Sequence, residues 1–296
     1  MHLRATTIGT AAVALSMATT ATAQVTFKNT GIELRDAVRD IGHIWLSPFR
    51  AEQRDWIAAI GVAAGAVMLV PVDDQIDSWI VRHPSTAFHD FARPFDETNP
   101  ELGDLSTGKR LLPISAALIA SGMVSDNRKL REAGWGCLSA WQASGTIRMV
   151  TYAAIARDRP SVENADQYDI DYPGGEWEQH SFFGGHAANA VACATFWNSR
   201  FKLGILEPIL YAGAAGISVS RMTDRRHWAS DTWVGVAAGY AMGRSIAARY
   251  ARREARRERA KETEPVRMSI LDGLNVGPAP GGLAFQWSGK FGGRRD

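Results

Sequence analysis

The 296-residue sequence has few cysteines, little excess charge and no long uninterrupted apolar run. Its two cysteines, Cys137 and Cys193, form no CxxC pair and lie near no histidine at a zinc-ligand spacing, so we expect no bound metal. Both lie in apolar runs, which leaves a disulfide and two buried thiols as open alternatives. The formal net charge of +2 lacks the basic bias of nucleic-acid-binding proteins, so we expect no nucleic-acid partner.

The first 23 residues have the pattern of a secretory signal peptide. Arg4 precedes a short apolar segment at 8–17, and Ala21-Thr22-Ala23 fits the small-x-small signal before a cleavage site. A retained N-terminal membrane anchor is the alternative interpretation of the same segment. The pattern predicts an exported protein that is periplasmic or membrane-associated.

Apolar runs rich in alanine and glycine dominate the rest of the chain. Most hold about 12 to 16 strongly apolar residues, fewer than the roughly 20 that cross a bilayer as a helix. Their length and composition predict buried helices of an all-α bundle, and a polytopic membrane protein is the competing interpretation. The runs cover residues 56–71, 111–124, 136–156, 186–197, 204–220 and 232–250.

After the signal segment 1–23, the composition suggests three regions. We expect an N-terminal helical region at 24–110, a core at 111–250, and a charged helix extension with a C-terminal tail at 251–296. Mixed charges at helical spacing open the last region and predict a solvated helix, with a membrane-surface contact as the alternative. The tail contains glycine, proline and alternating apolar residues at 277–291, which predict a short extended arm.

A polar stretch at 220–231, SRMTDRRHWASD, separates two apolar runs. His227 and Asp231 are four residues apart, so both lie on one face and can meet if a helix begins near Asp224. A carboxylate beside a histidine fixes its tautomer, and Arg221 can reach an anion held in front of His227. The stretch therefore predicts an anion site, with a solvated turn as the alternative.

Two further segments carry groups that suit an anion. Gly184 and Gly185 precede His186 at the start of an apolar run, where a tight turn can present backbone N–H groups to an anion. Arg159 ends another helical run that also contains Arg148, and guanidinium groups match phosphate oxygens in a bidentate way. These segments strengthen the prediction of an anion site.

Together these residues resemble the three motifs of the type 2 phosphatidic acid phosphatase superfamily, which also holds bacterial acid phosphatases and vanadium haloperoxidases. The family patterns read K-x6-R-P, P-S-G-H and S-R-x5-H-x3-D. The third pattern is complete at 220–231, and the first two are partial. Tyr152 stands at the lysine position, and Phe183 and Gly184 stand at the proline and serine positions. Arg148, one helical turn before Tyr152, is placed to supply the missing cation.

The resemblance implies an all-α helical bundle and a phosphoric ester hydrolase that uses neither metal nor cofactor. His227 would attack phosphorus, oriented by Asp231, and His186 would protonate the leaving oxygen. Arginine side chains and backbone N–H groups would hold the other phosphate oxygens. The residues expected to bind phosphate are Arg159, Arg221, Gly185, Gly184, Ser220, Arg148 and Tyr152.

The expected substrate is a phosphate monoester or a diphosphate, and lipid phosphates lead the candidates. Phe182, Phe183, Trp228 and Trp233 lie near the motifs and would suit a lipid tail, although core packing is the other use of such side chains. A vanadate-dependent haloperoxidase is one alternative, against which the loss of lysine at Tyr152 counts. A catalytically silent envelope binding protein of the same fold is the other.

Overall fold

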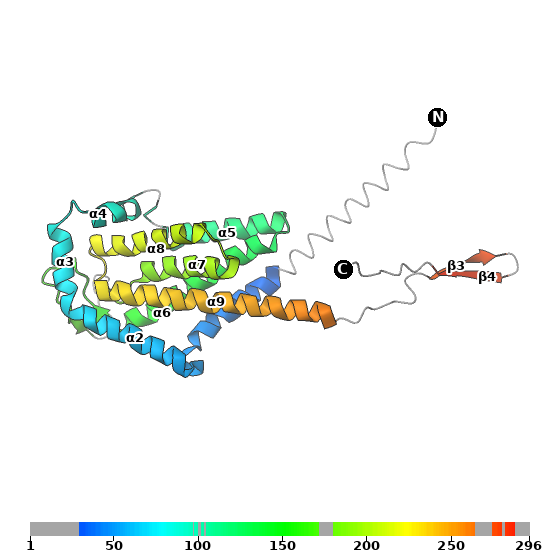
Figure 1. Cartoon of the computed structure of the whole chain (residues 1–296), viewed down its shortest axis with the longest axis horizontal. Helices are drawn as coiled ribbons and strands as arrows, with labels where there is room; N and C mark the ends of the chain where they lie inside the picture. The colour runs from blue at the N-terminus through cyan, green and yellow to red at the C-terminus, as the bar shows by residue number, and fades with distance from the viewer. Residues whose placement is uncertain are drawn as a thin grey trace, which may run out of the picture. The chain divides into compact units, whose positions relative to one another are not determined.

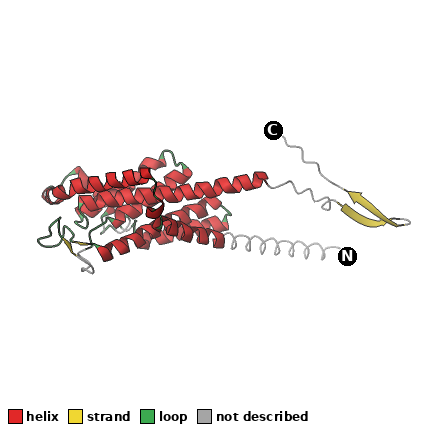
Figure 2. Cartoon of the chain, turned by 90° about the horizontal axis from the view of Figure 1, so that it is seen from below, coloured by secondary structure: helices red, strands yellow, loops and turns green. Residues whose placement is uncertain are grey.

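The computed structural model describes residues 30–96, 98–99, 102–103, 105–171, 180–263, 274–279 and 282–287. The predicted signal segment lies outside these residues. The chain divides into two units, Met1–Tyr250 and Ala251–Asp296. The first is an all-α bundle, as the sequence predicts, and helices dominate it (Figure 2).

Long helices build the bundle (Figure 1). Helix α5 packs against α6, α6 against α7, and α7 against α8. Each covers most or all of one apolar run of the sequence, and α6 and α9 extend beyond theirs into polar residues. Their bounds are α5 (Gly108–Val124), α6 (Arg128–Ala154), α7 (Gly185–Phe201), α8 (Leu206–Thr223) and α9 (Ala229–Thr263).

Helix α9 lies close to α7 because glycines recur on its facing side. A Cβ atom on Gly235 would lie 2.3 Å from the carbonyl oxygen of Gly184, and one on Gly239 would lie 2.4 Å from that of Ala188. Gly243 repeats the contact one turn later. Glycines at four-residue spacing form one face of a helix, so the two backbones can approach without side chains between them.

Shorter elements precede and connect the bundle. A helix at 30–45 opens the described chain, and η1, η2 and η3 are single 3₁₀ turns. Strand β1 pairs with β2, and β3 pairs with β4 as an antiparallel hairpin in the tail, where the sequence predicts an extended arm. The bounds are η1 (Pro48–Arg50), α2 (Gln53–Leu69), η2 (Val70–Val72), α3 (Asp73–Arg82), α4 (Ala87–Ala92), η3 (Arg93–Phe95), β1 (Ala156–Arg157), β2 (Ile170–Asp171), β3 (Leu274–Ala279) and β4 (Gly282–Trp287).

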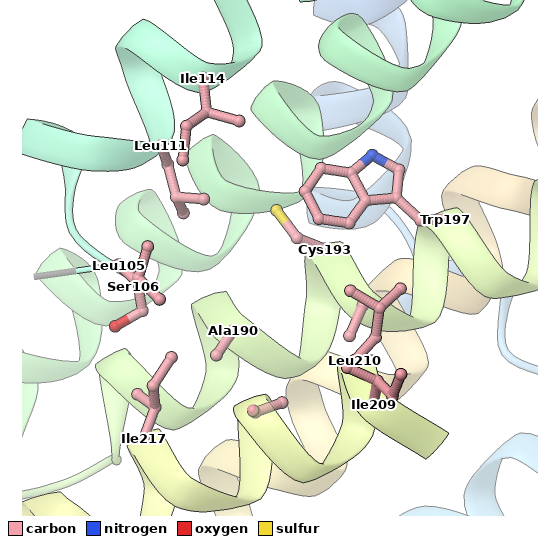
Figure 3. A pocket seen from close by; sticks show the side chains of 13 residues that line it. Leu105, Ser106, Leu111, Ile114, Ala190, Cys193, Trp197, Ile209, Leu210 and Ile217 are labelled. Carbon is pink, nitrogen blue, oxygen red and sulfur yellow. The ribbon is translucent and has the colours of Figure 1, made fainter. Parts of the chain in front are cut away.

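A disulfide between Cys137 and Cys193 ties α6 to α7. It resolves the alternatives that the sequence leaves open for the two cysteines. Beside it, an apolar cavity of about 170 Å³ lies between α5, α7 and α8, and the side chains of Leu111, Trp197 and Ile217 point into it (Figure 3). The disulfide therefore cross-links two helices of the bundle next to an apolar cavity in its interior.

Helix α2 departs from the predicted arrangement. The sequence predicts a buried helix at 56–71, but no residue of α2 is buried, so this prediction is wrong. The helical segment Gln53–Arg82 is long and apolar enough to cross a membrane by length and composition, and its most apolar window is wholly unburied. Trp56, Ile57 and Ile60 are among its exposed side chains. Apolar composition predicts that a helix is shielded from water. It does not predict whether protein or a membrane shields it.

Candidate active site

A small cavity of about 100 Å³ gathers side chains from every motif of the sequence. Helix α6 contributes Arg148 and Tyr152, and the segment after α6 contributes Arg159. His186 lies in the first turn of α7, and Arg221 lies in the last turn of α8. The cavity lining is Arg148, Tyr152, Arg159, His186, Arg221, Arg226 and His227.

The structure thus brings together six residues that the sequence analysis proposes as site residues, and it adds Arg226. Arg226 belongs to the five unspecified positions of the third motif, so the motif gave no signal for it. Three other proposed residues, Gly184, Gly185 and Ser220, are close by but do not line the cavity. Ser220 is buried, and its hydroxyl donates to the Ile217 carbonyl within α8 at 2.9 Å.

The two glycines set the path of the chain at the start of α7. Gly184 is the residue that precedes the helix, and its N–H donates to the Asp231 carbonyl at 3.0 Å, which joins the starts of α7 and α9. Gly185 lies against Arg148, because a Cβ atom there would come within 2.3 Å of the Arg148 Cδ atom. A side chain at 185 would therefore displace the arginine that stands one turn before Tyr152.

His227 is held by a backbone carbonyl. Its Nδ1 atom lies 2.6 Å from the Ser181 carbonyl oxygen. Because that oxygen can only accept a hydrogen bond, Nδ1 carries the proton and the lone pair of the neutral ring is on Nε2. The sequence gives no sign of this contact, since any residue at position 181 would have the same carbonyl.

Asp231 does not take the place that the sequence analysis expects. Helix α9 begins at Ala229 and not near Asp224, so His227 precedes the helix and does not share a helical face with Asp231. Among the described residues the Asp231 carboxylate accepts from the Ser181 hydroxyl at 2.5 Å, from Arg157 Nη1 at 2.5 Å and from the Trp228 N–H at 3.2 Å. Asp231 therefore reaches His227 through Ser181.

Burial and positive charge keep both imidazoles neutral. Burial, with Arg159, Arg221 and Arg148 as the nearby cations, lowers the pKa of His227 to about 3. Burial is also the main reason why the pKa of His186 lies well below its ordinary value, and Arg221 adds to it. A neutral imidazole keeps its lone pair, which a nucleophile needs.

Two neighbouring groups are shifted for the same reason. Burial raises the pKa of the Tyr152 hydroxyl, and the cations Arg148 and Arg159 oppose that shift. Burial raises the pKa of the Asp231 carboxyl, and Arg157 opposes it. His180 stacks on the Tyr152 ring at 4.8 Å, so it borders the site without lining it.

The pH dependence of catalysis should reflect these shifts. A group with a lowered pKa stays deprotonated until the pH falls through that lowered value, so we expect the acid limb of kcat/KM near pH 3, where His227 is protonated. An ordinary histidine would give a limb near pH 6.5, the value of an unperturbed imidazole.

The measurement is initial-rate hydrolysis of a soluble phosphate ester from acid to neutral pH. The unfolded state binds protons at these histidines more readily, so the fold loses stability as the pH falls below 6.5. Tryptophan fluorescence at each pH therefore serves as a folding control. An acid limb near pH 6.5 in folded protein would contradict the neutral, buried environment of His227.

The fold and the cavity define an all-α protein with a small cavity that is lined mainly by histidine and arginine side chains. Residues 135–255 match the model of the PAP2 superfamily, and the chain contains a domain of that superfamily. A solved structure described as the first transmembrane PAP2 type phosphatidylglycerolphosphate phosphatase from Bacillus subtilis is similar over 66% of this chain and 96% of that chain, at 16% identity and a TM-score of 0.42. No curated protein matches the chain.

Proposed function

We propose that the protein is a metal-free phosphatase that hydrolyses phosphate monoesters or diphosphates through a phosphohistidine at His227. Membership of the PAP2 superfamily supports a phosphatase. The single observation that carries the proposal is the cavity in which two neutral imidazoles, His186 and His227, meet the side chains of four arginines. Such a cavity suits a compact, strongly anionic group that is attacked from one side and protonated on the other.

The chemistry needs one nucleophile and one proton shuttle. His227 Nε2 attacks phosphorus, the bond from phosphorus to the ester oxygen breaks, and His186 in its protonated form gives its proton to that oxygen. Neutral His186 then takes a proton from water, whose oxygen attacks the phosphohistidine and releases phosphate. An incoming phosphate anion offsets the arginine charges that lower the histidine pKa values, so substrate binding favours a protonated His186.

The arginines stabilise charge on the phosphorus oxygens. Arg159 and Arg221 hold the positions that the family motifs assign to phosphate binding, and the N–H of Gly185 at the start of α7 adds a donor on the positive end of a helix. Arg148 takes over from the missing lysine. The Arg148 Nε atom is buried and has no hydrogen-bond partner among the described residues, which leaves a donor for a bound anion.

An apolar groove beside the site supports a lipid phosphate as the substrate. The groove has a volume of about 500 Å³ and follows α8 and α9. Val219 lies two residues before Arg221 in the last turns of α8, and Trp233 lies in the first turns of α9, so the groove reaches the two helix ends that flank the Arg221–His227 segment. Its lining carries no charged side chain and consists of Val191, Tyr211, Ala215, Ser218, Val219, Trp233, Val236, Ala237 and Tyr240.

The same surface supports an exported, membrane-associated location. The Trp233 indole donates to the Val62 carbonyl at 3.0 Å, so the exposed apolar helix α2 adjoins the groove. An acyl chain in the groove would be continuous with a membrane that contacts α2. The disulfide between Cys137 and Cys193 forms in oxidising compartments, which fits the predicted export.

Filling the groove should separate lipid from soluble substrates. Ala215 is exposed and lines the groove, so Ala215→Trp should lower kcat/KM for a long-chain lipid phosphate by about 10-fold or more, since several buried methylenes at about 0.8 kcal/mol each are displaced. Hydrolysis of p-nitrophenyl phosphate, which has no chain, should change little. The assay compares both substrates in mixed micelles.

Ala212→Trp is the matched control. Ala212 lies on the same helix and is also exposed, but it does not line the groove. It should leave both rates near those of the parent protein. Equal losses on the two substrates in Ala215→Trp, or equal losses in both variants, would remove the groove from substrate binding.

A further inference from the structure

A buried charge network lies behind the cavity and begins on α3, outside the region that matches the family. Asp73, the first residue of α3, is 1% exposed, Arg157 is 4% exposed and Asp231 is 0% exposed. Arg157 lies between the two carboxylates, with Nη2 at 2.9 Å from Asp73 Oδ2 and Nη1 at 2.5 Å from Asp231 Oδ1. One guanidinium is thus shared by two buried carboxylates that come from distant parts of the chain.

Ser230 closes the network on the α9 side. Its backbone N–H donates to Asp73 Oδ1 at 3.0 Å, and its hydroxyl bonds to Asp73 Oδ2 and accepts from Arg157 at 2.9 Å. Asp73 therefore holds the first turn of α9, where Asp231 is located. The Arg157 guanidinium also lies over the Trp228 ring, with its Cζ atom 5.6 Å from the ring centroid. Trp228 follows His227 directly in the sequence.

The contacts continue without a break to the imidazole. Asp73 contacts Arg157, Arg157 contacts Asp231, and Asp231 accepts from the Ser181 hydroxyl. The carbonyl of the same Ser181 fixes Nδ1 of His227. The Ser181 N–H donates to the Arg157 carbonyl at 3.0 Å, so the strand that carries Arg157 also holds the residue that aims the histidine.

We propose that Asp73 and Arg157 are positioning residues, which keep Ser181 and Asp231 in place so that His227 Nε2 points at phosphorus. The inference rests on the proposed function. A buried ion pair contributes little net stability compared with apolar side chains of the same volume, because desolvation offsets the attraction. A fully satisfied buried network does impose one geometry on its members, and the orientation of a nucleophile depends on such geometry.

A second ion pair on α3 provides a control, because it ties α3 to the bundle without contacting, in the described part of the chain, the residues that orient His227. Asp77 is also buried on α3 and pairs with Arg225, with Arg225 Nη2 at 2.8 Å from Asp77 Oδ2. This pair ties α3 to the loop before His227 but contacts neither Asp231 nor Ser181 among the described residues. Asp77→Asn therefore removes a carboxylate from the same helix without breaking the path to His227.

The first experiment compares the two substitutions in the full chain. Asp73→Asn should lower kcat for p-nitrophenyl phosphate by about 10- to 100-fold, as expected when a nucleophile is misplaced by a fraction of an ångström to 1 Å. The inhibition constant of vanadate should change by less than about threefold, because the arginines of the cavity remain. Asp77→Asn should leave kcat near the parent value. Equal kcat losses in the two variants would overturn the proposal.

Two further variants keep the test decisive if Asp73→Asn folds poorly. Asp73→Glu retains the charge and should recover part of kcat. Ser230→Ala removes the hydroxyl that bridges Asp73 and Arg157 without changing any charge, and it should lower kcat about severalfold, in line with a lost hydrogen bond of about 1 kcal/mol. Full kcat in a folded Ser230→Ala protein would overturn the proposal, whether or not Asp73→Asn folds.

A second readout does not depend on turnover. The Nδ1 proton of His227, bonded to the Ser181 carbonyl, should give a downfield, slowly exchanging signal in proton NMR spectra, assigned by its absence in His227→Ala. Asp73→Asn should shift that signal or speed its exchange, and Asp77→Asn should not. An unchanged signal in Asp73→Asn would overturn the positioning role. Absence of phosphatase activity in the parent protein would reject the proposed function and leave this NMR result to decide the network.

Discussion

Replacing His227 by alanine should lower phosphate-ester hydrolysis by about 10⁴-fold or more, the scale on which enzymes lose activity when a covalent nucleophile is removed. The reason is geometric as well as chemical. The ring is buried, its Nδ1 proton is held by Ser181, and its pKa of about 3 keeps Nε2 unprotonated. Rapid quenching of the parent protein with a radiolabelled substrate should also trap an acid-labile, alkali-stable phosphoprotein that the variant lacks.

His180→Ala is the control for the loss of a histidine near the site. His180 stacks on Tyr152 but does not line the cavity, so the variant should keep most of the activity and should still form the phosphoprotein. Hydrolysis by His227→Ala at the parent rate would remove His227 from the reaction. Label trapped on the variant would assign the covalent step to another side chain.

The helices of the bundle could be predicted because each apolar run has the length and composition of one helix. The runs at 111–124 and 186–197 lie wholly within α5 and α7, and the run at 204–220 lies within α8 except for its first two residues. The run at 56–71 has the same composition, yet α2 is exposed. Hydrophobicity indicates that a segment is shielded from water. A helix that packs on protein and a helix that faces a membrane can have the same apolar composition, so composition does not distinguish them.

The cavity could be predicted as far as the motifs specify side chains. The polar stretch at 220–231 predicts Arg221 and His227 as site residues, the two segments that suit an anion predict His186 and Arg159, and all four line one cavity. The partner of Asp231 could not be predicted from spacing. A contact between side chains four residues apart requires His227 to lie within the helix, but α9 begins two residues after it.

Contacts made by the backbone or between residues far apart in the chain could not be predicted from the sequence. Every residue type has the same backbone carbonyl, so the residue type at position 181 does not predict the contact with His227. Asp73 is 84 residues from Arg157, and an aspartate at the start of a helix is expected there for capping alone. Only the folded chain shows that its carboxylate faces a buried arginine.

Replacing His186 by alanine should slow hydrolysis by an amount that depends on the leaving group. For an alkyl or lipid phosphate we expect a loss of about 10²- to 10⁴-fold, the usual contribution of a general acid. His186 lies in the first turn of α7 and lines the cavity together with His227, so it can face the oxygen that departs. An alkoxide leaves poorly without a proton, whereas a nitrophenolate leaves readily without one.

The measurement is therefore kcat for a series of phosphate esters whose leaving groups differ in basicity. In the parent protein the rate should depend weakly on the basicity of the leaving group, because proton donation removes the developing charge. In His186→Ala the dependence should become steep, and p-nitrophenyl phosphate should lose the least. A loss of equal size across the whole series would show that residue 186 holds phosphate or supports α7 and does not donate the proton, and the acid would then have to be sought among the other side chains that line the cavity.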